Sequence, residues 1–367
     1  MIRQLRPPLA NGTRMVVETT GGVEHKAGWL AWCRRWSLRH RTMVVLLVAY
    51  AAAVLAPRFG ATLRRDWLAN HSEVLTASPV QILLAFLLLQ LGLSVDLRNA
   101  EPMRNLRRSA MLFFAVRTCA AILFALFAIV YDHELVRMIF WTLAIMMLVP
   151  AAGSSSGWCI HMQANARTSL VIILLSTVGS AVLMPLLIPV MALGADAEMA
   201  SLLHQWNSAY SCSFLVPWVL APIAVGIAVR QWSPERAVRL KHALRPWSLT
   251  ALGLLNYANG AVGLPRLVLA QDWLAGLLIL GICLATAAVL YMAAACQGRR
   301  MGLTTAETQA VTVTTSMLNT GLVLLLLASM APDAIYMQLT VIAYTFAQHI
   351  LVATMAHRRE AAVSRVE

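Results

Sequence analysis

Small polar residues interrupt two of the long apolar segments of the sequence. One contains the run Pro150-Ala-Ala-Gly-Ser-Ser-Ser-Gly157, and the other contains Thr312-Val-Thr-Thr-Ser316 followed by Asn319-Thr-Gly321. Hydroxyl and amide oxygens are ligands that hard cations accept, and helix ends exposed at an interruption carry partial charges that bind ions. The alternative is that these small residues only allow two helices to cross closely. The interruptions predict a substrate or ion site, to which we assign Ser154, Ser155, Ser156, Thr314, Thr315 and Asn319.

A single arginine, Arg117, lies well inside the apolar segment 109–131. A guanidinium at the centre of a membrane helix costs about 2.5–3.5 kcal/mol on the insertion scale, so a compensating interaction is expected. One interpretation is a fixed cation that attracts an anionic substrate. The other is that the long side chain extends to the membrane surface, where water solvates the charge.

Three further polar residues lie in apolar segments and are candidates for substrate or ion binding. His349 lies in the segment 333–356 and could carry protons, because an unperturbed imidazole titrates near neutral pH. Asn256 and Asn259 lie in the segment 246–264 and could contact the substrate. The alternative for each of them is a hydrogen bond to a neighbouring helix.

The composition indicates a protein whose main solvent is lipid. Only 12% of the 367 residues are charged and 59% are hydrophobic, compared with about 25% charged residues in soluble domains. One membrane crossing needs about 20 apolar residues. We therefore predict an all-α membrane protein with ten transmembrane helices. The ten apolar segments are residues 42–57, 77–95, 109–131, 137–160, 168–193, 213–230, 246–264, 270–296, 306–330 and 333–356.

The net charge of +13 indicates membrane topology rather than nucleic-acid binding, because the basic residues cluster beside the apolar segments. With both termini in the cytoplasm, 23 of the 29 basic residues fall on the cytoplasmic face and 5 on the opposite face. The positive-inside rule therefore predicts a multi-pass protein of the inner cell membrane with both termini inside. Residues 1–41 and 357–367 are the predicted cytoplasmic tails, and we expect no nucleic-acid partner.

The two interrupted segments occupy corresponding places, because each is the fourth of a series of five. Corresponding broken segments in two halves of opposite orientation are typical of inverted-repeat transporters, whose substrate site lies where the broken helices meet. The sequence therefore predicts two inverted five-helix repeats, residues 42–193 and 194–356. Helices 4 and 9 of the ten are predicted to be broken.

Four features of the sequence form a recognisable pattern when they are taken together. They are the run Leu91-Gly-Leu-Ser-Val95, the motif at Pro150, the stretch from Ser169 through Ser176 to Pro185, and Asn319. Together they resemble the bile acid:sodium symporter family. The resemblance covers about residues 42–356 and is most specific between Pro150 and Pro185. It implies a ten-helix carrier with sodium sites at the crossing of the broken helices, and it implies Ser155, Ser156 and Ser169 as sodium ligands in this chain.

The resemblance also implies a central glutamate, which would balance the charge of bound sodium. The family pattern Glu-Thr-Gly-x-Gln-Asn stands here as Thr314-Thr-Ser-Met-Leu-Asn319, so Thr314 occupies the glutamate position. A sodium-ligating glutamine of the family's third helix falls within a residue or two of Arg117. A fixed cation thus stands where the family would bind sodium, and we expect no sodium coupling of the family's type.

The predicted function is secondary transport of an organic anion by alternating access, the anion being bile-acid-like, a keto acid or similar. One alternative is a cation/proton exchanger of similar architecture, which normally needs a buried carboxylate. The other is a non-transporting membrane sensor or enzyme, for which the sequence has no catalytic motif. We expect a small organic anion and the lipid bilayer as partners and no cofactor, with sodium as the alternative ion. The substrate, the coupling ion and the oligomeric state stay open.

Overall fold

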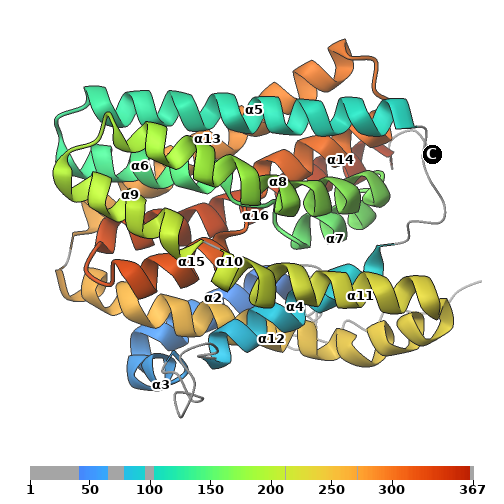
Figure 1. Cartoon of the computed structure of the whole chain (residues 1–367), viewed down its shortest axis with the longest axis horizontal. Helices are drawn as coiled ribbons and strands as arrows, with labels where there is room; N and C mark the ends of the chain where they lie inside the picture. Colours follow the sequence, from blue (N-terminus) through green and yellow to red (C-terminus); the bar gives the residue numbers. More distant parts are fainter. Residues whose placement is uncertain (1–40, 65–77, 96–102, 211, 271, 364–367) are drawn as a thin grey trace, which may run out of the picture. The chain divides into compact units, whose positions relative to one another are not determined.

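The computed structural model describes residues 41–64, 78–95, 103–210, 212–270 and 272–363 (Figure 1). Within these ranges the backbone is almost entirely helical, and its only strand-like pairing is an isolated antiparallel bridge between Ala151 and Leu318. The predicted tail 1–41 lies outside the described residues apart from Arg41. The helices that follow pack into two bundles.

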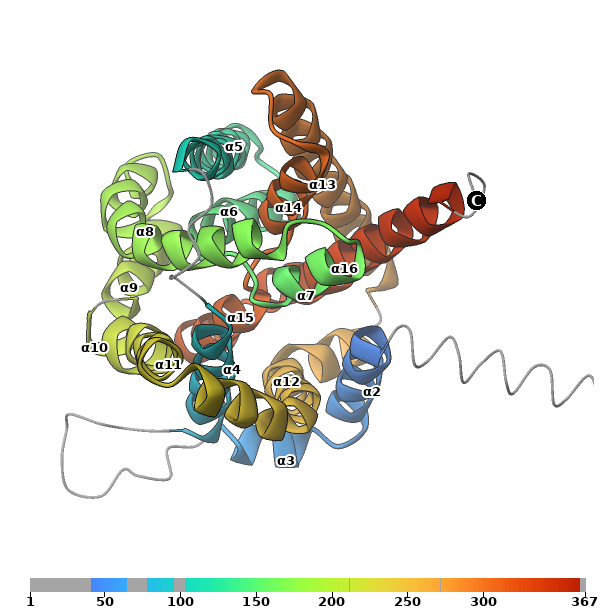
Figure 2. The ribbon, with the colours of Figure 1, turned by 90° about the vertical axis from the view of Figure 1, so that its right-hand side faces the viewer.

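The first bundle lies together in the lower half of Figure 2. It consists of α2 (Arg41–Leu55), α3 (Pro57–Thr62), α4 (Pro79–Ser94), α11 (Ala221–Trp232) and α12 (Pro234–Ala270). Helices α4 and α11 cross at two glycines, because a Cβ at Gly92 would lie 2.3 Å from the Ile223 carbonyl oxygen and one at Gly226 would lie 2.4 Å from the Leu89 carbonyl oxygen. Small residues of this kind allow membrane helices to approach closely.

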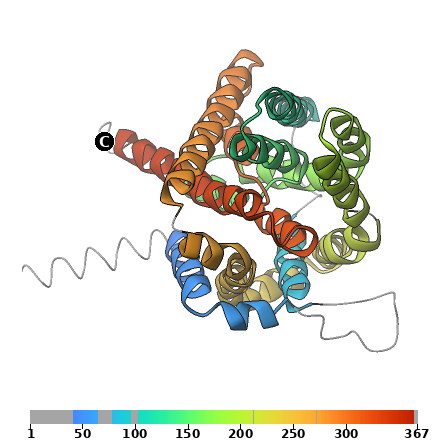
Figure 3. The same ribbon diagram turned by 90° about the vertical axis from the view of Figure 1, so that its left-hand side faces the viewer.

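The second bundle contains the two interrupted helices and the helices packed around them (Figure 3). It consists of α5 (Met103–Val130), α6 (Glu134–Leu148), α7 (Ser154–His161), α8 (Ala166–Ala192), α13 (Trp273–Arg300), α14 (Thr305–Ser316), α15 (Thr320–Met330) and α16 (Ile335–Val363). Between α8 and α11 the chain forms α9 (Ala197–Ala209), α10 (Cys212–Leu215) and the π-helix Val216–Leu220.

Four helical stretches are each long and apolar enough to cross a membrane: Arg104–Val130, Ala166–Ala192, Trp273–Arg300 and Ile335–Arg359. Shorter apolar helices, among them Pro79–Ser94 and Thr320–Met330, accompany them. Large apolar side chains such as those of Leu126 and Leu186 are exposed on the outer surfaces of these helices. Such a surface requires lipid as its solvent.

The helices extend beyond the predicted apolar segments. Helix α12 runs without a break through residues 234–245, which lie between two of the predicted apolar segments, and α16 continues to Val363, within the predicted tail 357–367. Arginine and lysine are good helix formers, so a helix continues past the apolar stretch that hydropathy detects. Helix α9 also falls outside the ten predicted segments. It begins at Ala197, and its N-cap is Asp196, whose side chain accepts a hydrogen bond from the Met199 amide at 2.8 Å.

Candidate functional site

Both interruptions expected from the sequence are present. Helix α6 ends at Leu148 and α7 begins at Ser154, while α14 ends at Ser316 and α15 begins at Thr320. Pro150 explains the first break, because proline lacks the amide hydrogen and pushes the preceding residue out of the helical region. Val149 is accordingly extended, with ψ 161°.

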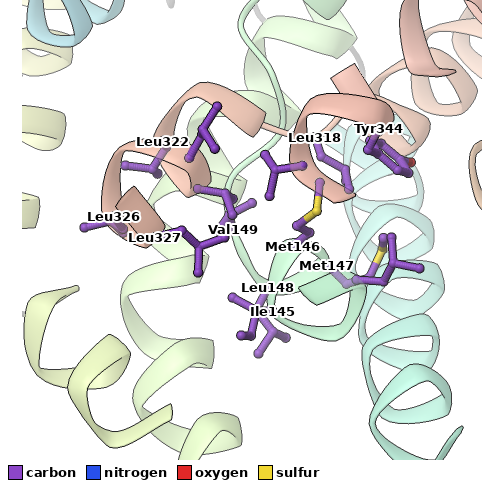
Figure 4. Packing of buried hydrophobic residues seen from close by; sticks show 14 of the residues in the cluster. Ile145, Met146, Met147, Leu148, Val149, Leu318, Leu322, Leu326, Leu327 and Tyr344 are labelled. Atoms are coloured by element: carbon purple, nitrogen blue, oxygen red, sulfur yellow. The ribbon is translucent and has the colours of Figure 1, made fainter. Parts of the chain in front are cut away.

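The two interruptions pair with each other as short antiparallel segments. The Ala152 amide donates to the Met317 carbonyl oxygen at 3.0 Å, and the Asn319 amide donates to the Pro150 carbonyl oxygen at 3.2 Å. Figure 4 shows Val149, directly after α6, near Leu318 of the second interruption and Leu322 of α15. Residues about 170 positions apart in the chain therefore form one crossing, in which each segment accepts and donates backbone hydrogen bonds in place of a helix.

Side chains from neighbouring helices satisfy further backbone groups of the crossing. The Ser176 hydroxyl of α8 accepts from the Ala151 amide at 3.0 Å. From α16, the Gln348 side-chain oxygen accepts from the Leu318 amide at 2.8 Å, and the Tyr344 hydroxyl donates to the Ser316 carbonyl oxygen at 3.0 Å. Irregular backbone survives at membrane depth when protein groups satisfy it in this way.

Arg117 of α5 is directed into the crossing, with only 2% of its surface exposed. Its Nη2 donates to the carbonyl oxygens of Met146 and Val149, at 2.7 and 2.8 Å. These carbonyls lie at the carboxyl end of α6, where helical partners are missing and the helix dipole is negative. The guanidinium also lies over the Phe113 ring, with Cζ 5.1 Å from the centroid. The side chain therefore does not extend to the membrane surface, and that interpretation of Arg117 is wrong.

Two nitrogens of Arg117, Nε and Nη1, are buried and have no hydrogen-bond partner among the described residues. The partners of the guanidinium are neutral carbonyl oxygens, so its charge is not balanced by a carboxylate in this part of the chain. Buried donors without a partner are rare and call for a specific explanation. The Thr315 hydroxyl of α14 is likewise buried, and no described residue forms a hydrogen bond with it.

Ser155, Ser169 and Thr314 form a buried cluster of hydroxyls. Oγ of Ser169 lies 3.2 Å from Oγ of Ser155 and 2.7 Å from Oγ1 of Thr314. Ser155 also donates to the Ala152 carbonyl oxygen and Thr314 to the Ala310 carbonyl oxygen, at 2.8 and 2.7 Å. Each hydroxyl has a single proton, so only three of these four contacts are hydrogen bonds at one time. All three hydroxyl protons of the cluster are therefore donated within the protein.

The remaining serines of the first interruption lie outside this cluster. The Ser156 hydroxyl donates to the Gly153 carbonyl oxygen at 2.9 Å, and Ser154 is half-buried at the start of α7. Asn319 accepts from the Leu322 amide at 3.3 Å and so acts as the N-cap of α15. None of these three side chains contacts the Ser155–Ser169–Thr314 cluster through a hydrogen bond that the described residues contain.

The cluster does not fit the sodium site that the family resemblance implies. Its oxygens are neutral and no carboxylate is hydrogen-bonded to them among the described residues, whereas the resemblance implies a glutamate that would balance the charge of the ion. Glu307 is the carboxylate nearest to the second interruption along α14, and it closes a capping box with Thr304 and accepts from Asn105 at 2.9 Å. It lies nine residues before Ser316, which is about 14 Å along a helix.

His349 and the two asparagines have hydrogen-bond partners within the protein. The Trp158 indole donates to Nδ1 of His349 at 3.2 Å, which fixes the imidazole proton on Nε2. The Asn256 side-chain oxygen accepts from the Tyr50 hydroxyl at 2.8 Å, and that of Asn259 accepts from Arg64 at 2.8 Å. Both asparagines belong to α12 of the first bundle, and Asn259 also donates to the Gly321 carbonyl oxygen at 3.4 Å, at the start of α15 beside the second interruption.

Several groups that contact the crossing or a predicted site residue were absent from the sequence-based site. Tyr344 and Ser176 contact the interrupted backbone, and Arg64 contacts Asn259. Their common signal is a polar side chain within or next to an apolar segment. That signal does not distinguish a residue that satisfies backbone from one that binds a ligand.

Interrupted helices that cross inside an apolar helical bundle are typical of secondary membrane transporters. The family model for the Sodium Bile acid symporter family matches residues 81–268, which is just over half of the 367-residue chain. The chain therefore belongs to this family and is a multi-pass membrane transporter of the bile acid/sodium symporter kind. The matched region contains Arg117, Ser155 and Ser169. The comparison with curated proteins gave no match.

Proposed function

We propose that the chain carries a small organic anion across the inner cell membrane by alternating access and without sodium coupling. In this proposal the chain crosses the membrane ten times, as two inverted five-helix repeats at residues 42–193 and 194–356, with both termini in the cytoplasm. The two bundles rock against each other and expose the crossing to one side of the membrane at a time. The place of each interrupted helix, fourth in its half, supports this architecture.

The arrangement of Arg117 is the observation that carries the proposal. One nitrogen of its guanidinium neutralises the carbonyl oxygens at the end of α6, which a bound cation would otherwise contact. The donors of the other two nitrogens have no hydrogen-bond partner among the described residues. Guanidinium donors bind carboxylates and sulfonates through charge-assisted hydrogen bonds, which are about twice as strong as neutral ones. A permanent cation thus supports the backbone and leaves a positive field for an anion.

The hydroxyl cluster supports the absence of sodium coupling. Ser155, Ser169 and Thr314 donate their protons to one another and to backbone carbonyls, so they offer a sodium ion only neutral lone pairs and no carboxylate ligand. A cation/proton exchanger normally titrates a carboxylate inside the membrane. The described carboxylates lie at helix ends or turns, as Glu307 and Asp272 do. Family membership favours transport over a sensor or an enzyme.

Uptake of labelled anions into proteoliposomes tests the proposal. The purified chain is reconstituted, and uptake of taurocholate, a keto acid and pantoate is measured in sodium buffer and in choline buffer. We expect uptake of at least one anion at the same rate in both buffers. In Arg117→Gln that uptake falls roughly ten- to hundredfold, because a hydrogen bond to a charged group contributes about 1.5–3 kcal/mol.

Arg107→Gln is the matched control, since Arg107 lies exposed on the same helix. Its uptake should equal that of the parent protein. Uptake that rises with a sodium gradient contradicts sodium-independent transport. Uptake that is unchanged in Arg117→Gln contradicts the role of Arg117, and no uptake of any of the three anions by correctly folded protein contradicts the carrier itself.

A further inference from the structure

A group of polar contacts joins the two bundles at one end of their interface. Arg64, which follows α3, and Asn259 and Arg266 of α12 belong to the first bundle. Their partners in the second bundle lie in α15 and in the turn between α15 and α16. The charge distribution predicts that this end faces away from the cytoplasm, and we call it the outer end.

Arg64 is the centre of the group. Its Nη1 donates to the Asn259 side-chain oxygen at 2.8 Å, and its Nη2 donates to the Ser329 hydroxyl at 3.0 Å and to the Leu325 carbonyl oxygen at 3.2 Å. Asn259 in turn donates to the Gly321 carbonyl oxygen at 3.4 Å. One guanidinium therefore spans α12 and α15, near the end of α15 where the helix dipole is negative.

Arg266 adds a second link on the water side of Arg64. Its Nη1 lies 2.7 Å from a carboxylate oxygen of Asp333 and 3.0 Å from the Pro332 carbonyl oxygen. Both side chains of this ion pair are well exposed, and exposed ion pairs contribute little. Arg64 is half-buried, so its hydrogen bonds compete less with water and dominate the link between the bundles.

The helix backbones also approach closely at the outer end. A Cβ at Gly263 of α12 would lie 2.8 Å from the side-chain oxygen of Gln338 in α16. Gln338 itself donates to the carbonyl oxygens of Ala331 and Pro332, at 3.0 and 3.1 Å, and so fixes the turn that Arg266 contacts. The polar contacts thus lie where the two bundles already touch.

We propose that Arg64, assisted by Arg266, is a latch that holds the outer end closed and that must release before the bundles separate there. This inference rests on the proposed alternating access, because a protein whose bundles never separate would have no use for a latch. The partners of Arg64 are an amide, a hydroxyl and a backbone carbonyl, all neutral. Neutral partners make a link that is directional but weaker than a buried ion pair, as a reversible contact requires.

Distances between spin labels test the latch in lipid nanodiscs without any substrate. All six native cysteines are replaced, and labels are attached to Leu55→Cys and Leu274→Cys, two exposed positions at the outer end on different bundles. A second pair, Val238→Cys and Arg300→Cys, reports the opposite end. In Arg64→Gln we expect the population of long outer distances to rise roughly tenfold, equal to about 1.4 kcal/mol, with shorter distances at the opposite end.

Three variants decide between outcomes. Arg58→Gln, an exposed arginine of α3, is the matched control and should leave both distributions unchanged. Ser329→Ala removes one partner of Arg64 and should shift the outer pair in the same direction by less, which keeps the test decisive if Arg64→Gln folds poorly. The double variant Arg64→Gln with Arg266→Gln should shift the distances of the outer pair most.

Unchanged distances in the double variant, or an equal shift in Arg58→Gln, overturn the latch. Failure of the latch and failure of the proposed function are distinguishable, because the distances are measured without an anion. Shifted distances with no anion uptake keep the latch and remove the proposed function. Anion uptake with unshifted distances keeps the proposed function and removes the latch.

Discussion

The two interrupted helices pair with each other, yet different chemistry stabilises each of them. At the first interruption a charged side chain, Arg117, contacts the carbonyl oxygens at the end of α6. At the second, the neutral groups of Tyr344 and Gln348 contact the backbone at Ser316 and Leu318. The crossing is therefore symmetric in its backbone and asymmetric in its charge. A carrier built on this crossing has its positive field on the side of the first interruption.

The interruptions also differ in what causes them. The first contains Pro150 and Gly153, which break a helix through their own backbone properties. The second, Met317–Asn319, contains neither residue type, and Met317 is extended at ψ 109°. Tertiary partners hold it open, since Tyr344 occupies the Ser316 carbonyl oxygen and Gln348 the Leu318 amide. The first break is local, and the second depends on α16.

The largest effect is expected at the charged interruption. Arg117→Glu would place an acceptor-only carboxylate against the carbonyl oxygens of Met146 and Val149, inside the protein. An uncompensated buried charge costs about 3–5 kcal/mol, so we expect a large fall in the thermal unfolding temperature in detergent. Arg107→Glu, exposed on the same helix, should change stability by no more than about 0.5 kcal/mol. Equal unfolding temperatures for the two variants would show that the two interruptions do not differ in charge.

A smaller effect is expected at the neutral interruption. Gln348→Leu leaves the buried Leu318 amide without its acceptor, which costs about 1–3 kcal/mol. Hydrogen exchange of the Leu318 amide should accelerate by the factor that corresponds to this free energy. Exchange of the amides in the first interruption should change less. Gln205→Leu, on the exposed face of α9, is the matched control. Exchange at Leu318 that matches the control would mean that the second interruption does not depend on α16.

The same difference explains what the sequence could predict. Proline and glycine at the first interruption act locally, so the break, its position and its place among the apolar segments were all predictable. Arg117 was recognisable because a charge stands alone in an apolar segment, but its partners are backbone oxygens 29 and 32 residues away, which no pattern identifies. The roles of Tyr344 and Gln348 depend on how α16 packs against the crossing. The same holds for Asn256 and Asn259, which are bound by Tyr50 and Arg64 of distant segments.

The smallest effect is expected at the hydroxyl cluster that bridges the two interrupted helices. Ser155→Ala leaves Ser169 free to donate to Thr314, and Thr314 keeps its bond to the Ala310 carbonyl oxygen, so only the bond to Ala152 is lost. We expect a stability loss of about 0.5–1.5 kcal/mol and anion uptake that is the same with and without sodium. Ser201→Ala, on the exposed face of α9, serves as the control. A sodium site would behave differently, because removing one of its few oxygen ligands would lower sodium-dependent uptake far more than stability. Uptake that loses a sodium response in Ser155→Ala alone would therefore assign the cluster to an ion and leave Arg117 with a purely structural role.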